Sequence, residues 1–381
     1  PYSFTGEDVV EISCHGAPVI IRQLLDACLK FDARMAEPGE FSLRALSNGK
    51  INLSQAEAVR DLINARTIAA AQQASRQLRG ELSNRLQPLK DELLSVIVIL
   101  ESALEFVEDD LPDIQAGIVQ RRLASISAKI SEMASTFQAG RLLREGLKVA
   151  LVGRPNVGKS SIFNCLVGYD RAIVTAVAGT TRDILQEGLS IGGIPVTLID
   201  TAGIRETNDE IENIGVKRTK GVLNDADLVV VVLGQSQGLS DEDYKILSEV
   251  RELNHLVAIN KVDLNGIKTI LDDRLEISNC VMTSAKTGEG LDTLRSNILA
   301  PFQNQNENAN GFLISDARHF DLLLRANSEI EDSVQLIEQH ASEEIVLIGL
   351  HNALGLLGQI SGETSTEDLL TRIFSTFCIG K

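Results

Sequence analysis

Residues 153–161 read Gly-Arg-Pro-Asn-Val-Gly-Lys-Ser-Ser, a G-x-x-x-x-G-K-S spacing between an apolar run and an apolar helical stretch. Glycines at this spacing let backbone N–H groups turn inward around a phosphate, and a helix N-terminus adds its positive end. We expect Lys159 to bridge the β- and γ-phosphates of a nucleotide, and the Ser160 hydroxyl to ligate Mg²⁺. The alternative, a chance glycine-rich turn, fits poorly with this strand–loop–helix context.

Two further segments place polar residues where a bound phosphate and its metal would need them. The apolar residues 196–199 predict a strand, and Asp-Thr-Ala-Gly follows at 200–203. An acid at the carboxyl end of a parallel strand can hold Mg²⁺ through water, and the Gly203 N–H can reach the γ-phosphate. Residues 179–183 (Gly-Thr-Thr-Arg-Asp) offer Thr181 as a second protein ligand of Mg²⁺. A threonine pair alone would indicate only a loop, but its position between the two other motifs favours the functional interpretation.

The base is indicated by Asn-Lys-Val-Asp at 260–263, at the end of another predicted strand. Asp263 can accept both N1–H and N2–H of guanine, whereas adenine would leave the buried carboxylate unpaired. Lys261 is expected to pack over the base. Thr-Ser-Ala-Lys at 283–286 completes the pocket, with the Ala285 backbone N–H directed at guanine O6. The nucleotide is therefore predicted to be GTP.

Each of these short motifs is weak alone, but five of them in this order and spacing are specific. The residues assigned to GTP binding are Asn156, Val157, Gly158, Lys159, Ser160, Ser161, Thr180, Thr181, Asp200, Thr201, Ala202, Gly203, Asn260, Lys261, Asp263, Ser284, Ala285 and Lys286. An α/β domain of the P-loop GTPase type follows from them.

The residue that orients the attacking water is not evident from these motifs. In the best-known small GTPases a glutamine follows the glycine of the Asp-x-x-Gly motif, and here that position is Ile204. The nearby acids that could replace it are Glu206, Asp209, Glu210 and Glu212. The alternative is that they form the solvated face of a switch helix. Asn156 could contribute its side-chain carbonyl to a monovalent-cation site beside the phosphates, or could simply favour the turn.

The rest of the chain divides by composition into a framework around this site. Residues 1–53 are mixed: residues 9–12 predict a strand, and the apolar positions after Pro18 predict a helix. Residues 54–146 are strongly helical, with a capping box expected from Ser54 and Glu57 and breaks at Pro88 and Pro112.

Residues 147–301 alternate short β-rich runs with helices, which predicts a parallel sheet resembling that of Ras. Residues 302–381 begin with a polar linker and return to a helical period. The flanking helices are amphipathic and must bury their apolar faces, so we expect them to pack together. The fold class is therefore multi-domain: an α/β P-loop G domain inserted in an all-α helical domain, after the remnant of an α+β N-terminal domain.

Composition limits the possible partners. The 381 residues carry a net charge of −17, and residues 301–381 hold 12 acidic against 4 basic side chains. Proteins that grip nucleic acid alone usually present a basic surface, so a nucleic-acid partner would need a local patch or a second, basic protein. The five scattered cysteines include no C-x-x-C pair, which argues against a disulfide framework or a zinc site.

The apolar runs are too short to span a bilayer, and no basic-then-apolar leader is evident, so we expect a cytoplasmic protein without membrane contact. The chain opens with Pro1 rather than Met and is expected to be an N-terminally truncated fragment.

The whole chain resembles the MnmE family, also called TrmE, of bacterial tRNA-modification GTPases. The resemblance rests on the GTPase inserted in helices, on Phe-Thr-Gly-Glu-Asp at 4–8, on Pro-Gly-Glu-Phe at 38–41, and on the terminal Phe-Cys-Ile-Gly-Lys at 377–381. It implies that residues 1–53 are the C-terminal part of a tetrahydrofolate-binding and dimerisation domain. It also implies a homodimer whose G domains meet across the switches, with hydrolysis stimulated by potassium.

The family likeness also implies a chemistry. The resemblance implies that such proteins work with the flavoprotein MnmG, which carries the FAD, in a heterotetramer that adds a carboxymethylaminomethyl group at C5 of the tRNA wobble uridine. The one-carbon unit comes from 5-formyl- or methylene-tetrahydrofolate, and tRNA is contacted mainly through the partner.

Several residues are assigned by position in the family pattern. Glu212 matches the acid that orients water, and Arg205 falls on a switch arginine that we include as a catalytic candidate. The implied potassium ligands are Asn156, Thr175, Val177 and Thr180. The implied folate-binding residues are Glu11, Lys50 and Lys381. Cys378 matches a cysteine important for modification, although its residue type alone fits a small buried side chain equally well.

Two other functions fit parts of the pattern. A ribosome-assembly GTPase, acting as an RNA-binding switch, would share residues 153–161 and 200–203, but this chain lacks a G-x-x-G RNA clamp in a basic setting and a second phosphate loop. A mechanical GTPase would move its helical arms without folate chemistry. Binding of a formyl-tetrahydrofolate separates the MnmE-like function from both.

Overall fold

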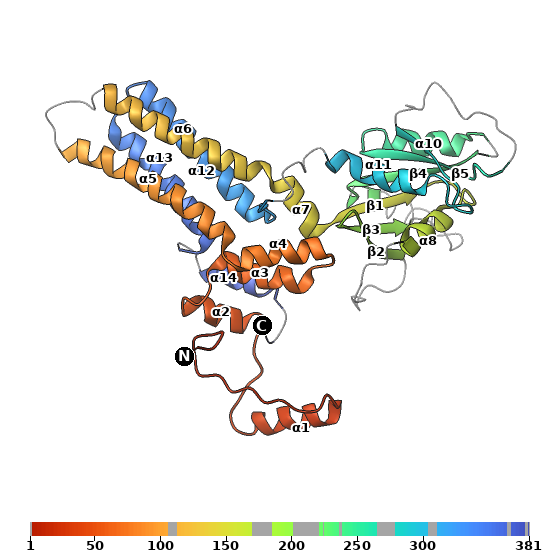
Figure 1. The fold of residues 1–381 in the computed structure, drawn as a ribbon, viewed down its shortest axis with the longest axis horizontal. Coiled ribbons are helices and arrows are strands. Elements are labelled where there is room, and N and C mark those ends of the chain that lie inside the picture. The colour runs from red at the N-terminus through yellow and green to blue at the C-terminus, as the bar shows by residue number, and fades with distance from the viewer. Residues whose placement is uncertain are drawn as a thin grey trace. The chain divides into compact units, whose positions relative to one another are not determined.

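The computed structural model describes residues 2–105, 113–169, 185–200, 221–223, 225–235, 238–264, 279–303, 311–363, 367–377 and 380. These residues form two compact units (Figure 1). The helical unit comprises residues 1–64, 72–135 and 316–381, and the α/β unit comprises residues 65–71 and 136–315. The α/β unit therefore interrupts the sequence of the helical unit, as the predicted fold class requires.

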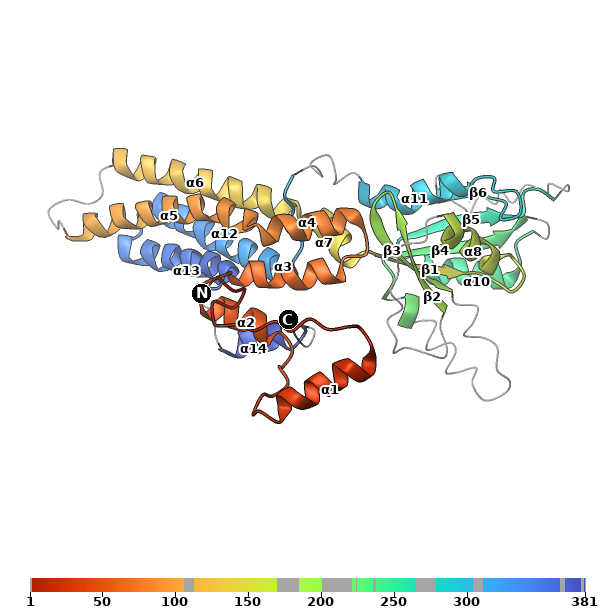
Figure 2. The same ribbon diagram turned by 60° about the horizontal axis from the view of Figure 1, so that its bottom comes forward.

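Four long helices form the body of the helical unit. They are α5 (Glu81–Glu105), α6 (Asp113–Ser135), α12 (Ala317–Glu338) and α13 (Glu343–Ser361). Figures 1 and 2 show them side by side, and α6 packs on α12 while α5 packs on α13. Two helices before the insertion thus pack on two helices after it, which confirms that the helical stretches on both sides share one fold.

The apolar positions of these helices recur every three or four residues and face one another. Leu93, Ile97 and Leu100 of α5 are buried, as are Leu350 and Leu357 of α13. Burying one such side chain contributes about 1.5–3 kcal/mol, so this interface stabilises the bundle more than helix propensity does. Of the described helices, α13 alone is long and apolar enough to span a membrane, by length and composition only. Of that apolar stretch 44% is buried, including Leu350 and Leu357 in this bundle.

The shorter helices of this unit are α1 (Pro18–Leu29), α2 (Glu40–Ser47), α3 (Leu53–Asn64) and α14 (Glu367–Phe374), and α4 (Ile68–Leu78) begins in the other unit. Helix α14 lies beside α2 (Figure 2). Phe374 and Phe377 form a small apolar cluster with Leu53 and Ala56. Gly39 has a φ of 69° and leaves no room for a Cβ, which would lie 2.9 Å from the Phe374 carbonyl oxygen. The expected turn before α2 therefore also lets the C-terminal segment approach.

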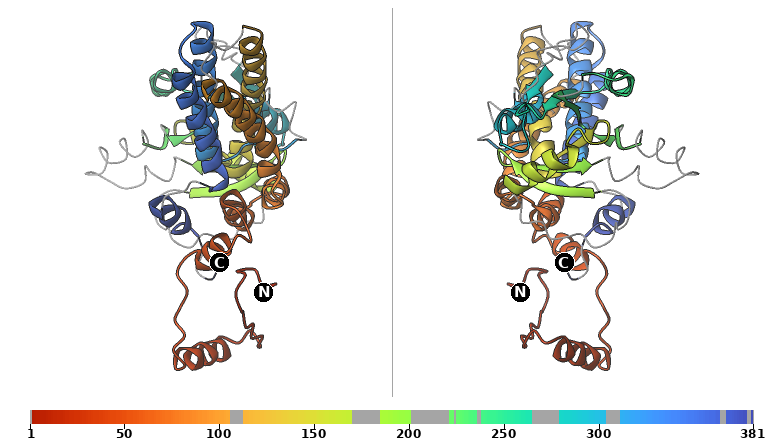
Figure 3. Two further views of the ribbon diagram at one scale, coloured as in Figure 1. Left: turned by 90° about the vertical axis from the view of Figure 1, so that its left-hand side faces the viewer. Right: turned by 90° about the vertical axis from the view of Figure 1, so that its right-hand side faces the viewer.

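The N-terminal residues differ from the sequence expectation in one respect. Helix α1 forms as predicted, but it buries no residue and stands apart from the other helices of its unit (Figure 3). Residues 9–12, expected to form a strand, are irregular and exposed. A strand is stabilised by pairing with a neighbour, and the described residues supply no partner strand for this segment.

Two expectations about helix ends were wrong. The cap of α3 is not Ser54 with Glu57. Asn52 Oδ1 accepts the Gln55 N–H at 2.9 Å, and Gln55 Oε1 accepts the Asn52 N–H at 3.0 Å, so the reciprocal capping box begins two residues earlier. Pro88 does not break α5 but lies inside it. Pro88 and Asn84 are both exposed, so water can bind the carbonyl that a proline nitrogen leaves without a donor. Pro112 lies outside the described residues.

The α/β unit is built on one six-stranded sheet in the order β2-β3-β1-β4-β5-β6. Its elements are α7 (Phe137–Glu145), β1 (Leu147–Val152), α8 (Lys159–Tyr169), β2 (Leu185–Ile191), β3 (Ile194–Asp200), β4 (Leu228–Gly234), α10 (Asp241–Val250), β5 (His255–Asn260), β6 (Cys280–Met282) and α11 (Leu291–Gln303). Strands β3, β1, β4, β5 and β6 are parallel, as predicted. The edge strand β2 is antiparallel to β3. Gly192 and Gly193 join the two with positive φ at both positions, the geometry that a two-residue hairpin favours.

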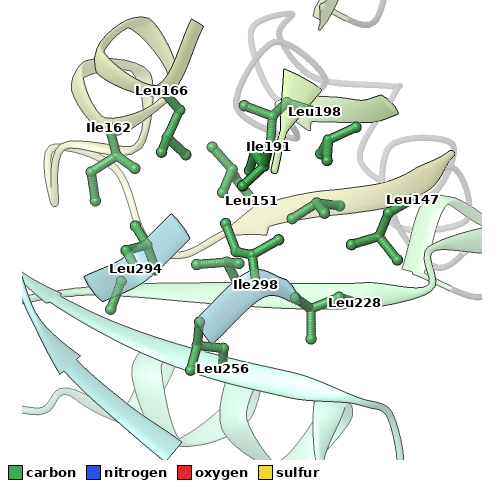
Figure 4. Packing of buried hydrophobic residues seen from close by; sticks show 14 of the residues in the cluster. Leu147, Leu151, Ile162, Leu166, Ile191, Leu198, Leu228, Leu256, Leu294 and Ile298 are labelled. Atoms are coloured by element: carbon green, nitrogen blue, oxygen red, sulfur yellow. The ribbon is translucent and has the colours of Figure 1, made fainter. Parts of the chain in front are cut away.

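Both faces of the sheet are buried. On one face Leu151 of β1 packs with Ile162 of α8 and Ile298 of α11 (Figure 4). On the other face Val231 of β4 belongs to a second cluster, with Ile246 of α10 packed against it. Parallel strands covered by helices on both sides read as continuous apolar runs, which is why this region was recognisable in sequence. The strands that follow β1 in the chain lie on both sides of it, with β3 on one side and β4 on the other. In open α/β sheets, ligands bind at such a switch point.

Candidate functional site

The phosphate loop connects β1 to α8, as its motif predicted. Gly153 and Gly158 both have positive φ, of 150° and 100°. A Cβ on Gly153 would lie 2.4 Å from the Val232 carbonyl oxygen, and one on Gly158 would lie 2.2 Å from Asn260 Nδ2. Both glycines are therefore required by backbone conformation and by close contact. The loop rests directly on the carboxyl end of β4 and on the start of the Asn260–Asp263 motif.

Lys159 is buried and folds back on the loop that contains it. Its Nζ donates to the carbonyl oxygens of Gly153 at 2.8 Å and Arg154 at 2.9 Å. These carbonyls hold the ammonium group inside the ring of the loop, where a phosphate would be expected. The positive charge is therefore placed for the predicted role.

A hydroxyl and a carboxylate meet beside this lysine. The Ser160 Oγ donates to Asp200 Oδ2 at 3.2 Å, and Asp200 is almost fully buried at the end of β3. Oxygen ligands of this kind suit Mg²⁺. Within the described part of the chain there is no group of three or more His, Cys, Asp or Glu side chains that could hold a metal alone. The donor set thus fits an ion that takes its remaining ligands from phosphate and water.

The two segments assigned to the base, residues 260–263 and 283–286, meet beside the phosphate loop. Asn260 Nδ2 donates to the Val157 carbonyl at 3.0 Å, and its Oδ1 accepts the Ala285 N–H at 3.1 Å. Asp263 Oδ1 accepts the Ser284 hydroxyl at 2.7 Å. One asparagine therefore joins the phosphate loop to the loop after β6, and the specificity carboxylate is held by a neighbour.

The lysine of the same motif contacts the phosphate loop. Lys261 has a φ of 68°, and its Nζ donates to the Asn156 carbonyl at 2.7 Å. Ala285 N–H was expected to bind guanine O6, whereas here it donates to Asn260. If a bound guanine accepts this N–H, its O6 must replace Asn260 Oδ1 as the acceptor. Ser161 and Lys286 lie at the surface of the unit, next to these residues in sequence.

Several predicted residues lie outside the described residues, and the structure says nothing of them. They are Thr175, Val177, Thr180, Thr181, Thr201, Ala202, Gly203, Arg205, Glu206, Asp209, Glu210, Glu212, Cys378 and Lys381. The remaining residues assigned to GTP are brought together in the α/β unit.

The residues assigned to folate belong to the helical unit. Asn48 Nδ2 donates to the Thr5 carbonyl at 2.7 Å, and a Cβ on Gly6 would lie 2.9 Å from Lys50 Cε. The Phe4–Asp8 motif therefore lies against the end of α2, next to Lys50. Glu11 is exposed in the irregular segment that follows.

Close to these residues, Glu40 joins two arginines on the surface. Hydrogen bonds from Arg34, from the Glu37 N–H and from Arg44 lower the pKa of the Glu40 carboxyl to about 2. The Arg44 guanidinium also pairs with Glu7 at 3.0 Å. The Pro-Gly-Glu-Phe motif is thus tied to the Phe-Thr-Gly-Glu-Asp motif by charge, and both carried the family resemblance.

Sequence reasoning missed two buried ionic groups. In the α/β unit, Arg154 of the phosphate loop pairs with Asp243 of α10 at 3.2 Å. In the helical unit, Glu57 of α3 pairs with Arg318 and His319 of α12 at 3.0 and 2.9 Å. Ser-x-x-Asp at 240–243 was recognisable as a helix cap, but no local signal links it to residue 154. Glu57 had been assigned to a cap instead.

Comparisons with known proteins cover the whole chain. The MnmE helical domain family matches residues 53–378, and the family described as the GTP-binding protein TrmE N-terminus matches residues 1–50. The chain is 46% identical to the tRNA modification GTPase MnmE of Aquifex aeolicus, over 100% of this chain and 85% of that protein. It is 42% identical to the MnmE of Koribacter versatilis, over 100% and 84%.

Among solved structures, the G domain of the T. maritima FeoB iron transporter is 29% identical over 40% of this chain and 97% of that one. The TM-score is 0.31, too low for that structure to support an argument.

Proposed function

This chain belongs to the MnmE family of tRNA modification GTPases, and we propose that its α/β unit binds GTP through the residues assembled above. It is a GTPase of tRNA modification, and GTP with Mg²⁺ is its substrate. The observation that carries the residue assignments is the base pocket, where Asn260 ties the phosphate loop to Ala285 and Ser284 holds Asp263. A carboxylate fixed in this way can accept two N–H groups of guanine, and adenine cannot supply them.

Magnesium is proposed to bind at Ser160 and Thr181, with Asp200 acting through water. The contact between Ser160 and Asp200 supports this assignment, because the two oxygens already lie within hydrogen-bond distance of each other. When bound, the ion would neutralise charge on the β- and γ-phosphates. Thr201, Ala202 and Gly203 would complete the γ-phosphate contacts.

Potassium is proposed to bind at Asn156 with Thr175, Val177 and Thr180. Asn156 is exposed in a left-handed turn with φ of 64°. The Lys261 ammonium binds the main-chain carbonyl of Asn156, and this contact does not involve the Asn156 side chain. A cation there would supply the positive charge that an arginine supplies in other GTPases. We propose that Glu212 orients the attacking water and that Arg205 assists in the same switch.

The chemistry served by hydrolysis is proposed to be carboxymethylaminomethyl modification at C5 of the tRNA wobble uridine. Glu11, Lys50 and Lys381 would bind 5-formyl- or methylene-tetrahydrofolate, and Cys378 is a candidate for the modification step. The contact of Gly6 with Lys50 supports a shared site on this side of the unit.

The flavoprotein MnmG would bring the FAD and most of the tRNA contact to a homodimer of this chain, giving a heterotetramer. The net charge of −17 supports a division of labour in which another protein grips the RNA. The proposed compartment is the cytoplasm.

The proposed domain roles follow the same lines. Residues 1–53 belong to the folate-binding and dimerisation domain, and residues 147–301 form the G domain. Residues 54–146 and 302–381 are the two parts of the helical domain.

The proposal is tested by GTP turnover of the protein in KCl and in NaCl at equal ionic strength. We expect faster hydrolysis in potassium and a loss of that difference in Asn156→Ala. In Glu212→Ala, GDP affinity should be kept while turnover falls roughly 100-fold or more, as for loss of a residue that orients the nucleophile. Equal rates in both salts would remove potassium from the mechanism, and unchanged turnover would remove Glu212.

A further inference from the structure

The phosphate loop contacts strand β4 and the segment that joins β4 to α10. Gly153 lies against the Val232 carbonyl, and Gly234 lies within 3.7 Å of Val157, each distance being measured from a Cβ position on the glycine. Farther along, Arg154 Nη2 donates to the Gly238 carbonyl at 3.2 Å. The loop therefore contacts β4 at two points and the following segment at one.

The strongest of these attachments is ionic. Arg154 Nε lies 3.2 Å from Asp243 Oδ2, with the arginine side chain 16% exposed and the aspartate 1% exposed. Asp243 Oδ2 also accepts the Ser240 N–H at 3.0 Å and the Ser240 hydroxyl at 2.9 Å. The carboxylate that caps α10 thus also neutralises the arginine of the phosphate loop.

The attachment bears on Lys159 through the backbone. The carbonyl of Arg154 is one of the two that accept the Lys159 ammonium, and the other belongs to Gly153. A side chain anchored to α10 restricts the rotation of its own peptide. The anchor therefore favours the arrangement in which both carbonyls face the lysine and the loop stays open for an anion.

We propose that Asp243, through its ion pair with Arg154, is a positioning residue of the nucleotide site that holds the phosphate loop in its phosphate-accepting shape before nucleotide binds. The inference rests on the proposed nucleotide site. Asp243 touches no reacting atom, and its effect is on the fraction of molecules whose loop is ready. Apparent affinity falls in proportion to that fraction, whereas turnover of the bound complex does not.

The test is the affinity of the full chain for a fluorescent GDP analogue, together with KM and kcat for GTP. Asp243→Asn should weaken GDP binding about tenfold, because losing the charge that faces Arg154 lowers the fraction of molecules whose loop is ready, and raise KM similarly with kcat within about twofold. The matched control is Asp241→Asn, which removes the same charge from the same first turn of α10 at an exposed position. It should bind GDP as the wild type does.

A double-mutant cycle decides whether the pair acts as one unit. Arg154→Met keeps an unbranched side chain as far as the position of Nε and removes the charge, and the double variant should be no weaker than either single variant. Three results would each overturn the inference. They are losses of GDP affinity that multiply in the double variant, an equal loss in Asp241→Asn, and wild-type affinity in Asp243→Asn. If Asp243→Asn does not fold, Arg154→Met decides alone, because it should still weaken GDP binding. A wild-type protein that does not bind GDP would instead overturn the proposed site.

Discussion

The substitution Glu57→Gln is expected to destabilise the helical unit far more than an ordinary surface change would. Glu57 of α3 is 3% exposed at its side chain and lies beside two basic side chains of α12. Its carboxylate accepts Arg318 Nε at 3.2 Å and Arg318 Nη2 at 3.0 Å, and it lies 2.9 Å from His319 Nε2. Arg318 also donates to the Gln359 carbonyl at the end of α13. One carboxylate therefore balances the charge where three helices meet.

The magnitude follows from the burial of this group. Burial raises the pKa of the Glu57 carboxyl, but the charge and hydrogen bond of His319 and the charge of Arg318 outweigh it, so the pKa lies below its ordinary value. Removing one partner of a buried ion pair costs about 3–5 kcal/mol. Arg318 is 20% exposed, and glutamine keeps one carbonyl acceptor, so we expect about 3 kcal/mol. For a unit of this size that loss lowers Tm by about 6–12 °C.

Thermal unfolding followed by circular dichroism at 222 nm measures this change in Tm, because the helical unit contributes most of the helix. The chain has no Trp whose fluorescence could report unfolding. Glu92→Gln is the matched control. Glu92 lies in the same unit, about one-third exposed, 3.9 Å from Arg122 and 3.7 Å from Lys129. A surface pair of this kind contributes about 0–1 kcal/mol. If Glu57→Gln lowered Tm no more than Glu92→Gln does, the argument from burial would be refuted.

Three further outcomes are expected. The Tm difference between the wild type and Glu57→Gln should be full above pH 4.5, the ordinary carboxyl pKa, and should shrink as pH falls through the lower folded value; a constant difference from pH 6 to pH 3 would contradict this. Asp263→Asn should lower kcat/KM for GTP about 100-fold or more and favour xanthosine triphosphate, whose C2 carbonyl can accept from the new amide; an unchanged preference for GTP over xanthosine triphosphate would remove Asp263 from base recognition. Gly140→Ala should destabilise the α/β unit by about 1–3 kcal/mol, because its Cβ would lie 2.2 Å from the Ile314 carbonyl oxygen. Gly168→Ala, which meets nothing within 4 Å, is its control in calorimetry, and equal Tm values for the two variants would contradict the steric argument.

Local patterns were enough to predict much of the molecule. The β1–loop–α8 order, the parallel strands and the approach of the Asn260–Asp263 and Thr283–Lys286 motifs all follow from apolar runs ending in polar residues. Parallel strands place their carboxyl ends at one edge, so motifs that follow different strands must meet there. The contacts of Asn260 with Val157 and Ala285 join loops that follow three different parallel strands, as this rule predicts.

The expectations that failed depend on competition between nearby residues. Asn52 and Gln55 cap α3 in place of Ser54 and Glu57, although both pairs have the required spacing. The local pattern cannot show which pair caps the helix, because this depends on the contact of Glu57 with Arg318, 261 positions away in sequence. A carboxylate gains more from the Arg318 guanidinium and the His319 ring than from one backbone N–H. Glu57 therefore contacts α12, and Asn52 caps α3.

The Arg154–Asp243 pair could not be predicted from the sequence for the same reason. A Ser-x-x-Asp cap and a phosphate-loop arginine are each complete local features, and neither requires the other. Their meeting depends on β4 lying next to β1, which places the start of α10 beside the loop. The cap carboxylate then has a charge to balance within reach, and burying both groups together is less costly than burying either alone. Sheet order, rather than sequence spacing, therefore determines which residues support the phosphate loop.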